Sequence, residues 1–389
     1  MNFTSTITPD FKKERNYGLD VLRALAILSV LNVHSAHFFQ PDSIPFKLLT
    51  FLNLDGVTLF FVLSGFLVGG ILIKLFEKGD VTFKELFNFW IRRWFRTLPN
   101  YFLILTILLL LGLHFRTVAS FSQVKNYYYF LANFKKAMPD NLFPEAWSLS
   151  VEEWFYLIVP VLVFILVNSY HFKLKTSILF TVIVVIIFST WFRYYRLSHW
   201  HGITEDLMDA NFRKQVITRL DSIMYGVLGA FLAHYHRAMW KKYRWSLFFI
   251  GIFLLYSNYL QYVFGYFGPV YAYVLFFSFQ TIGFLCLFPL LTELKSGKGF
   301  VYRQVTKLSL ISYSAYLINY SIIKYYVIDY LDKKLFGGVA LSYLELINYF
   351  IFWLLTIAGA AFLYNYFEKP FTGLREYAGA KNEKYALNT

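Results

Sequence analysis

The sequence has few charged residues and a single cysteine. Charged side chains make up 15% of the 389 residues, 58% are apolar, and the mean hydropathy is +0.49. Soluble domains carry roughly 25% charged residues, so the composition excludes an ordinary soluble protein. Cys286 lies in an apolar segment and has no partner for an intrachain disulfide, which favours a structural role over a nucleophilic one.

Several other signals are also absent from the sequence. No internal repeat or linker divides the chain, which predicts one transmembrane domain over 1–389 without an appended soluble domain. No small-residue cleavage site follows the first apolar run, so this run is expected to remain as an anchor. His34 and His37 lie about one turn apart, but no ordered set of further ligands accompanies them, so we predict no metal site and no tightly bound cofactor. Ser64 lacks the preceding glycine of a nucleophile elbow and is assigned to packing.

Apolar segments long enough to cross roughly 30 Å of hydrocarbon follow one another along the chain. The ten predicted spans are residues 20–39, 52–76, 98–114, 151–169, 177–195, 219–235, 245–263, 270–291, 309–328 and 345–367. The predicted fold class is therefore an all-α polytopic membrane protein. We expect it to be a multi-pass protein of the cytoplasmic membrane.

The net charge of +14 is best explained by topology. With the N-terminus inside, 22 Lys and Arg fall in the inner segments and 12 in the outer ones, which follows the positive-inside rule. This asymmetry predicts that both termini are cytoplasmic. Aromatic residues, at 22%, suit an interfacial belt and helix packing, so no nucleic-acid partner is expected.

Arg23 and His34 are ionisable residues inside the first predicted span, where such groups are costly and often functional. Eleven residues of α-helix bring them within about 20° of the same face and about 16 Å apart along the axis. His34 would lie on the order of 21 Å from the inner end of the span. The structural alternative is a neutral histidine that is hydrogen-bonded between helices.

Arg92, Arg93 and Arg96 are expected at the inner end of the third span. Guanidinium groups present a planar fork of donors that suits phosphate, so the cluster predicts a site for a phosphorylated cytosolic molecule. Simple positive-inside anchoring is the alternative. Glu152 and its neighbour Glu153 lie near the start of the fourth span.

Two further patterns predict contacts between helices. Gly65 with Gly69, and Gly226 with Ala230, form small-xxx-small pairs that favour close approach. Arg219 and Asp221 are expected to form an intramembrane ion pair that supports the fold, with a functional site as the alternative.

The sequence resembles the acyltransferase-3 family of integral membrane O-acyltransferases. The resemblance rests on seven blocks in the same order, from residue 15 to about 371: GLDVLRALAILSVLNVH, GVTLFFVLSGFL, FWIRRWFRTLP, AWSLSVEEWFYLIVP, RLDSIMYGVLGA, ISYSAYLIN and FEKPF. Each block alone is weak, but the ordered set is specific.

The resemblance implies an enzyme that moves an acyl group, often acetyl, from cytoplasmic acyl-CoA to a hydroxyl of a carbohydrate or other cell-surface acceptor. The partners it implies are acyl-CoA as donor substrate, the acceptor and the lipid bilayer. The family's matching positions are Arg23 and His34 for its signature pair, Arg93 and Arg96 with Arg92 beside them for its arginine motif, and Glu152 for its acidic position.

Acyl transfer to a hydroxyl needs a proton acceptor, and the neutral imidazole of His34 suits that role. A covalent acyl-histidine relay is the alternative. Glu152, expected on the outer side, would orient the acceptor or the base, unless it only interacts with the helix dipole. Many family members have Asp where this chain has Thr58, and Asp55 lies three residues earlier.

A transporter or flippase-like carrier that passes a solute or protons through the same buried residues is the main alternative function. A non-catalytic membrane scaffold is a third, but it leaves the intramembrane ionisable residues unexplained. The sequence names neither the acyl group, nor the acceptor, nor the oligomeric state.

Overall fold

The computed structural model is helical throughout its described part, which contains no strand. The structure describes residues 15–51, 54–118, 120–134, 136–138, 142–200, 202–335 and 340–374. Inside a bilayer the backbone has no water to bond with, and a helix satisfies its own N–H and C=O groups. The all-α prediction is confirmed for these residues.

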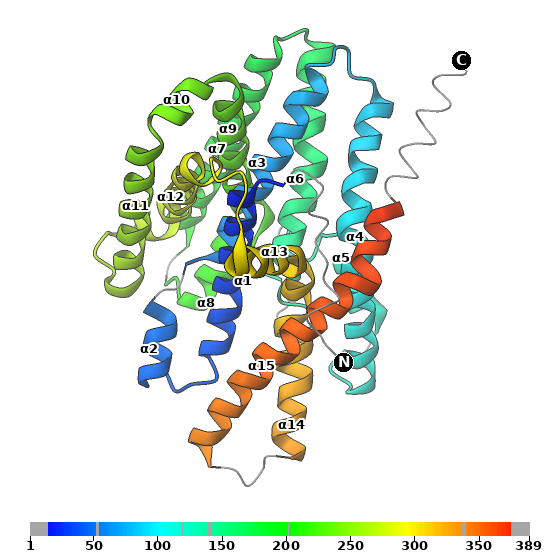
Figure 1. Cartoon of the computed structure of the whole chain (residues 1–389), viewed down its shortest axis with the longest axis vertical. Helices are drawn as coiled ribbons and strands as arrows, with labels where there is room; N and C mark the ends of the chain where they lie inside the picture. The colour runs from blue at the N-terminus through cyan, green and yellow to red at the C-terminus, as the bar shows by residue number, and fades with distance from the viewer. Residues whose placement is uncertain are drawn as a thin grey trace.

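Eight candidate spans in the described part are long and apolar enough to cross a membrane. The α-helices and π-helical segments (η) within them are α1 (Tyr17–Ala36), α2 (Ile44–Phe51) and α3 (Gly56–Phe76), α4 (Phe83–His114), α6 (Ala146–Phe164) with η1 (Ile165–Ser169), α7 (Leu174–His199), α9 (Val216–Tyr235), η3 (Tyr271–Leu275) with α12 (Phe276–Leu291), and α15 (Leu341–Leu363) with η5 (Tyr364–Glu368). Figure 1 shows long helices side by side, with α2 and α14 at one end of the molecule and α10 at the other.

The other described elements are α5 (Phe121–Tyr128), α8 (Glu205–Met208), η2 (Asp209–Arg213), α10 (Arg237–Lys242), α11 (Arg244–Phe264), α13 (Gly299–Ile318), η4 (Asn319–Ile328) and α14 (Asp329–Lys334). Helix α11 and the α13–η4 pair coincide with two of the ten predicted spans but are not among the eight candidates. Helix α13 is polar for a span, since it carries Arg303, Lys307 and several serines. The count of ten and the cytoplasmic termini therefore remain predictions.

Helix α4 is longer than the predicted third span, 98–114. It begins at Phe83 because Thr82 and Glu85 form a capping box: the Glu85 carboxylate accepts from the Thr82 N–H at 2.8 Å, and the Thr82 hydroxyl accepts from the Glu85 N–H at 3.4 Å. Its 32 residues extend about 48 Å. Arg92, Arg93 and Arg96 therefore lie within the helix, before the apolar stretch predicted as the span, and their place at its inner end remains a prediction.

Helices α3 and α9 approach each other through small residues. A Cβ added to Gly65 would lie 1.9 Å from the carbonyl oxygen of Ile223 and 3.0 Å from Gly226 Cα. A Cβ on Gly69 would lie 3.1 Å from the Cβ of Ala230. The predicted small-xxx-small contact is confirmed, and it fixes α3 against α9 at the backbone level.

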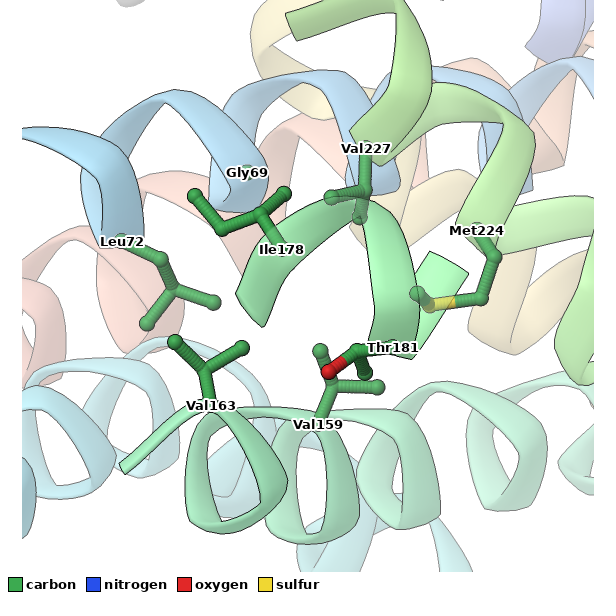
Figure 2. A pocket seen from close by; sticks show the side chains of 8 residues that line it. All are labelled: Gly69, Leu72, Val159, Val163, Ile178, Thr181, Met224 and Val227. Atoms are coloured by element: carbon green, nitrogen blue, oxygen red, sulfur yellow. The ribbon is translucent and has the colours of Figure 1, made fainter. Parts of the chain in front are cut away.

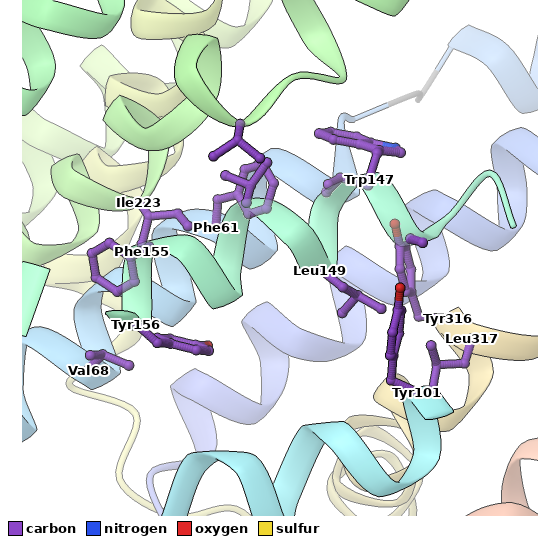
Figure 3. Close-up of a cluster of buried hydrophobic side chains, with 14 of the residues drawn as sticks. Phe61, Val68, Tyr101, Trp147, Leu149, Phe155, Tyr156, Ile223, Tyr316 and Leu317 are labelled. Atoms are coloured by element: carbon purple, nitrogen blue, oxygen red, sulfur yellow. The ribbon is translucent and has the colours of Figure 1, made fainter. Parts of the chain in front are cut away.

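Helix α6 passes through the main apolar core (Figure 3). Its Trp147, Leu149, Phe155 and Tyr156 side chains are buried with Tyr101 of α4. Apart from the Trp147 indole N–H and the Tyr101 and Tyr156 hydroxyls, the contacts of these side chains are apolar and pack α6 against α4.

The pocket in Figure 2, between α3, α6, α7 and α9, is a small packing gap. Its volume is about 10 Å³, and apart from Thr181 its labelled side chains are apolar. One water needs about 10–15 Å³ and several polar partners, so this gap is not a ligand site.

Candidate active site

A polar cavity of about 380 Å³ opens where the start of α1 meets α4, α13 and η5. Its lining consists of Arg15, Asn16, Leu19, Asp20, Arg23, Arg96, Ser309, Leu310, Tyr364, Glu368, Lys369 and Thr372. Four of these residues are cationic and two are acidic. Small-molecule sites commonly measure about 300–1,000 Å³, so the size and the excess positive charge both fit part of an anionic ligand.

Asp20 organises the cations at one wall of the cavity. The Arg15 guanidinium donates to both Asp20 carboxylate oxygens, from Nη2 at 2.6 Å and from Nε at 3.0 Å. Arg23 Nη1 donates to Oδ1 at 3.2 Å, and the Ser309 hydroxyl donates to the same oxygen at 2.8 Å. The hydrogen bond to Asp20 raises the pKa of Arg15 above its ordinary value, against the effect of burial. One buried carboxylate thus holds two guanidinium groups and leaves an excess positive charge.

Glu368 is the second acidic residue of the cavity lining, and it is already engaged. Its Oε2 accepts from the Ser314 hydroxyl at 2.6 Å and from Asn100 Nδ2 at 3.3 Å. These bonds join η5 to α13 and α4 at a buried position. Glu368 therefore supports the cavity wall.

The three arginines of α4 have different surroundings. Arg92 and Arg96 are both exposed, but only Arg96 is part of the cavity lining, beside Arg23. The Arg93 guanidinium carbon lies 5.6 Å from the ring centroid of Tyr156, a cation–π distance. The predicted cluster is thus divided, and Arg96 is its member at the cavity.

Glu152 lies near Arg93, although we expected it at the outer side, apart from the arginines. The Tyr156 hydroxyl donates to Glu152 Oε2 at 2.9 Å, so the Ser64 hydroxyl, 2.6 Å from the Tyr156 oxygen, is the donor in that pair. Glu152 is about 9 Å into α6 from its start, and Arg93 is about 15 Å into α4. The two helices overlap in depth because both begin earlier than predicted, so the expected separation is wrong.

Glu153 connects α6 to α4. Its Oε1 accepts from the Thr97 hydroxyl at 2.9 Å, and the Thr97 carbonyl accepts from the Tyr313 hydroxyl at 2.7 Å. These bonds fix α4, α6 and α13 relative to one another.

His34 lies near the other end of α1 from the cavity and contacts η4. Its Nδ1 is 2.5 Å from Asn319 Oδ1, and its ring centroid is 4.5 Å from that of Tyr320. The Lys324 ammonium donates to the His34 carbonyl oxygen at 3.3 Å. Arg23 and His34 share one uninterrupted helix, so α1 connects the cavity to the imidazole over about 16 Å.

The family described as "Acyltransferase domain" matches residues 16–365. The chain belongs to this acyltransferase-3 family. Among its relatives, the peptidoglycan O-acetyltransferase OatA of Listeria monocytogenes is 31% identical over 157 residues, which cover 37% of this chain and 23% of the relative. The O-acetyltransferase OatA of Staphylococcus aureus is 27% identical over 245 residues, which cover 58% of this chain and 37% of the relative. The chain thus aligns with less than half of each relative, and no solved structure matches it.

At Thr58, where many acyltransferase-3 members have Asp, this chain places a carboxylate from the preceding turn. Asp55 caps α3, and its side chain accepts from the Thr58 N–H at 3.0 Å and from the Thr58 hydroxyl at 2.8 Å. Arg219 Nη2 donates to that hydroxyl at 2.5 Å, and Arg213 Nη2 lies 3.9 Å from Asp55. The Asp55 carboxylate therefore lies beside Thr58 and pairs with Arg213.

The predicted ion pair between Arg219 and Asp221 is wrong. Asp221 pairs with Arg193 of α7 at 2.7 Å, and both side chains are fully buried. Residues two apart on a helix point about 200° from each other, so Arg219 and Asp221 cannot face one another. Arg219 instead lies over the ring of Phe277, at 4.5 Å from its centroid, and donates to Thr58.

Several residues at these sites were missed from the sequence. Tyr156, Asn319 and Glu368 each lie in a block that carries the acyltransferase-3 resemblance, and block membership was the signal that could have identified them. Arg213 lies in η2, outside every block. Burial alone would raise the pKa of its partner Asp209, but Arg213 and the neighbouring lysine lower it below its ordinary value.

Proposed function

We propose that this protein is a membrane O-acyltransferase that transfers an acyl group, with acetyl the favoured one, from cytoplasmic acyl-CoA to a hydroxyl of a carbohydrate or other cell-surface acceptor. The observation that carries the proposal is the cationic cavity at one end of α1, with a histidine near the other end of the same helix. Membership of the acyltransferase-3 family, and the names of the OatA relatives, support O-acetylation.

The donor binds by its phosphates in the cavity. Arg96 and Lys369 are free of the Asp20 network and supply the primary phosphate contacts, while Arg15 and Arg23 contribute their excess charge. Arginine suits this role because its planar fork makes paired bonds to phosphate oxygens. The positive-inside asymmetry supports a cytoplasmic position for this end of α1.

The pantetheine arm then extends along α1 and brings the thioester to His34. The imidazole accepts the hydroxyl proton as the acceptor oxygen attacks the thioester carbonyl; when the carbonyl re-forms and the C–S bond breaks, the imidazolium gives that proton to the sulfur, and CoA leaves as the thiol. An acyl-histidine intermediate would use the same ring nitrogen as nucleophile.

Glu152 acts through the Tyr156–Ser64 chain and not as an outer-face acceptor group. Its closeness to Arg93 places a carboxylate and a cation beside the middle of α4 and α6. We assign it to positioning Arg93 and the donor arm.

The test uses the purified protein in nanodiscs with acetyl-CoA and measures release of the CoA thiol. Glycan fragments from peptidoglycan are the first acceptors to try, since the Listeria relative is named for that substrate. Thiol release should depend on the acceptor, and His34→Ala should lower the rate about 10²-fold to 10⁴-fold, because it removes the proton acceptor.

The same assay separates the proposal from a carrier function. A transporter would show flux of its solute without any thioester cleavage. Acceptor-dependent CoA release that persists in His34→Ala would keep the acyltransferase assignment and remove His34 from the mechanism. Absence of CoA release with every hydroxyl acceptor, from protein shown to be folded, would overturn the proposal.

A further inference from the structure

The segment that contacts His34 is unusual in its backbone. Helix α13 passes into η4, ten residues of π-helix, at Asn319. Such segments are rare and frequently occur at functional sites. Asn319 is fully buried, and its side chain is directed at the imidazole of His34.

The hydrogen bonds of Asn319 determine which way its amide points. An asparagine amide has two N–H donors on nitrogen and an acceptor oxygen. Nδ2 donates to the carbonyl oxygens of Ala315 at 3.0 Å and Tyr316 at 2.7 Å, so both donors are used within the helix. A flipped amide would direct its oxygen at two carbonyl oxygens and lose both bonds. The group that faces His34 is therefore the oxygen, which only accepts.

An acceptor-only partner requires the proton of the imidazole to be on Nδ1. A neutral imidazole carries one proton, so Nε2 then holds the lone pair. We propose that Asn319 is a positioning residue that fixes His34 in the Nδ1–H tautomer and leaves Nε2 as the atom that accepts the proton. This inference rests on the proposed function for the role of Nε2, but the tautomer itself follows from the contacts.

An amide is well suited to this task within a membrane. In serine hydrolases a carboxylate holds the histidine tautomer. A carboxylate at this depth would place a charge in a low-dielectric region, whereas the amide supplies the same acceptor without a charge. The Tyr320 ring, 4.5 Å from the imidazole, further restricts rotation of the ring.

The test is solid-state ¹⁵N NMR of the full-length protein labelled with ¹⁵N-histidine. The chain has eight histidines, so signals lost in His34→Gln identify those of His34. Protonated and unprotonated ring nitrogens differ in shift. The expected result is a protonated Nδ1 and an unprotonated Nε2 at the pH of activity. A protonated Nε2 in the unaltered protein, in a neutral or a cationic ring, would overturn the proposal without any variant.

Variants separate tautomer control from simple packing. Asn319→Leu should give a mixture of tautomers and lower kcat roughly tenfold, the scale of one lost hydrogen bond. Asn319→Asp keeps an acceptor and should retain the Nδ1–H tautomer. Asn258→Leu removes another buried amide, on α11, and should leave the His34 signals unchanged. An unchanged tautomer in Asn319→Leu would also refute the assignment, whereas transfer that survives His34→Ala would refute only the role of the base.

Discussion

Gly65→Ala is the change whose effect follows most directly from the geometry. The new Cβ would lie 1.9 Å from the carbonyl oxygen of Ile223 and 2.9 Å from its carbonyl carbon, and Cβ atoms essentially never come closer than 3.0 Å to another heavy atom. Backbone atoms cannot rotate away as a flexible side chain can. Helices α3 and α9 must therefore separate by about 1 Å at this point.

A separation of this size has a definite energetic scale. A gap of 0.5–1 Å forfeits about a quarter to a half of each van der Waals contact across it. Overpacked core substitutions typically lower the free energy of unfolding by about 1–3 kcal/mol. The higher helix propensity of alanine relative to glycine raises it by at most about 1 kcal/mol. Unfolding entropy scales with chain length, so about 1 kcal/mol shifts Tm by only about 1 °C in a chain of 389 residues, and we expect Gly65→Ala to lower Tm by roughly 2 °C.

Thermal unfolding in detergent, followed by circular dichroism, measures this effect. Gly70→Ala, on the same helix, is the matched control, because its Cβ would meet nothing within 4 Å. It should keep or slightly raise Tm. Ser64 contacts Tyr156, so displacement of α3 should also slow acyl transfer in Gly65→Ala. Equal Tm values for the two variants would refute the close contact between α3 and α9.

Three further predictions concern the donor, the direction of transfer and a buried ion pair. Arg96→Lys should weaken acetyl-CoA binding about tenfold in nanodiscs, because an ammonium lacks the bidentate fork, whereas Arg92→Lys should leave the affinity unchanged. Equal affinities of the two variants would mean that Arg96 serves only as a positive-inside anchor. In sealed vesicles of one orientation, acetyl-CoA should act only from the side of the termini and a polar acceptor only from the other; activity with both on the same side would refute transmembrane transfer. Arg193→Leu should destabilise the protein by about 3–5 kcal/mol, because Asp221 loses its partner, and the double variant Arg193→Leu/Asp221→Leu should unfold at a higher temperature than the single one.

The sequence allowed the helices to be located because hydropathy reports burial in lipid directly. It failed at the start of α4, where Arg92, Arg93 and the polar residues before them depress the local hydropathy. The capping box of Thr82 and Glu85 was a readable signal for that start, and it is independent of hydropathy. Caps thus locate a helix end where the local hydropathy is too low to show it.

Some contacts of the candidate site could also be predicted from the sequence, and others could not. Arg23 and His34 were predictable as one stripe because they share a helix, and the helical period fixes their relation. The approach of Glu152 to Arg93 depends on the relative depth of two separate helices, which is set by side-chain packing along α6. The helical period within each segment does not predict the depth of one helix relative to the other.

The ten residues between Arg23 and His34 therefore act as a fixed spacing. Helix α1 is held at its first turn, where the Asn16 side chain donates to the Thr292 carbonyl at 2.9 Å, and at its last turn, where His34 meets Asn319. Since both ends are fixed, the cavity and the imidazole cannot approach each other by bending of the helix, so the proposed mechanism requires a flexible carrier that spans about 16 Å. One added residue would turn His34 about 100° away from Asn319, so the spacing and the tautomer depend on the same helix.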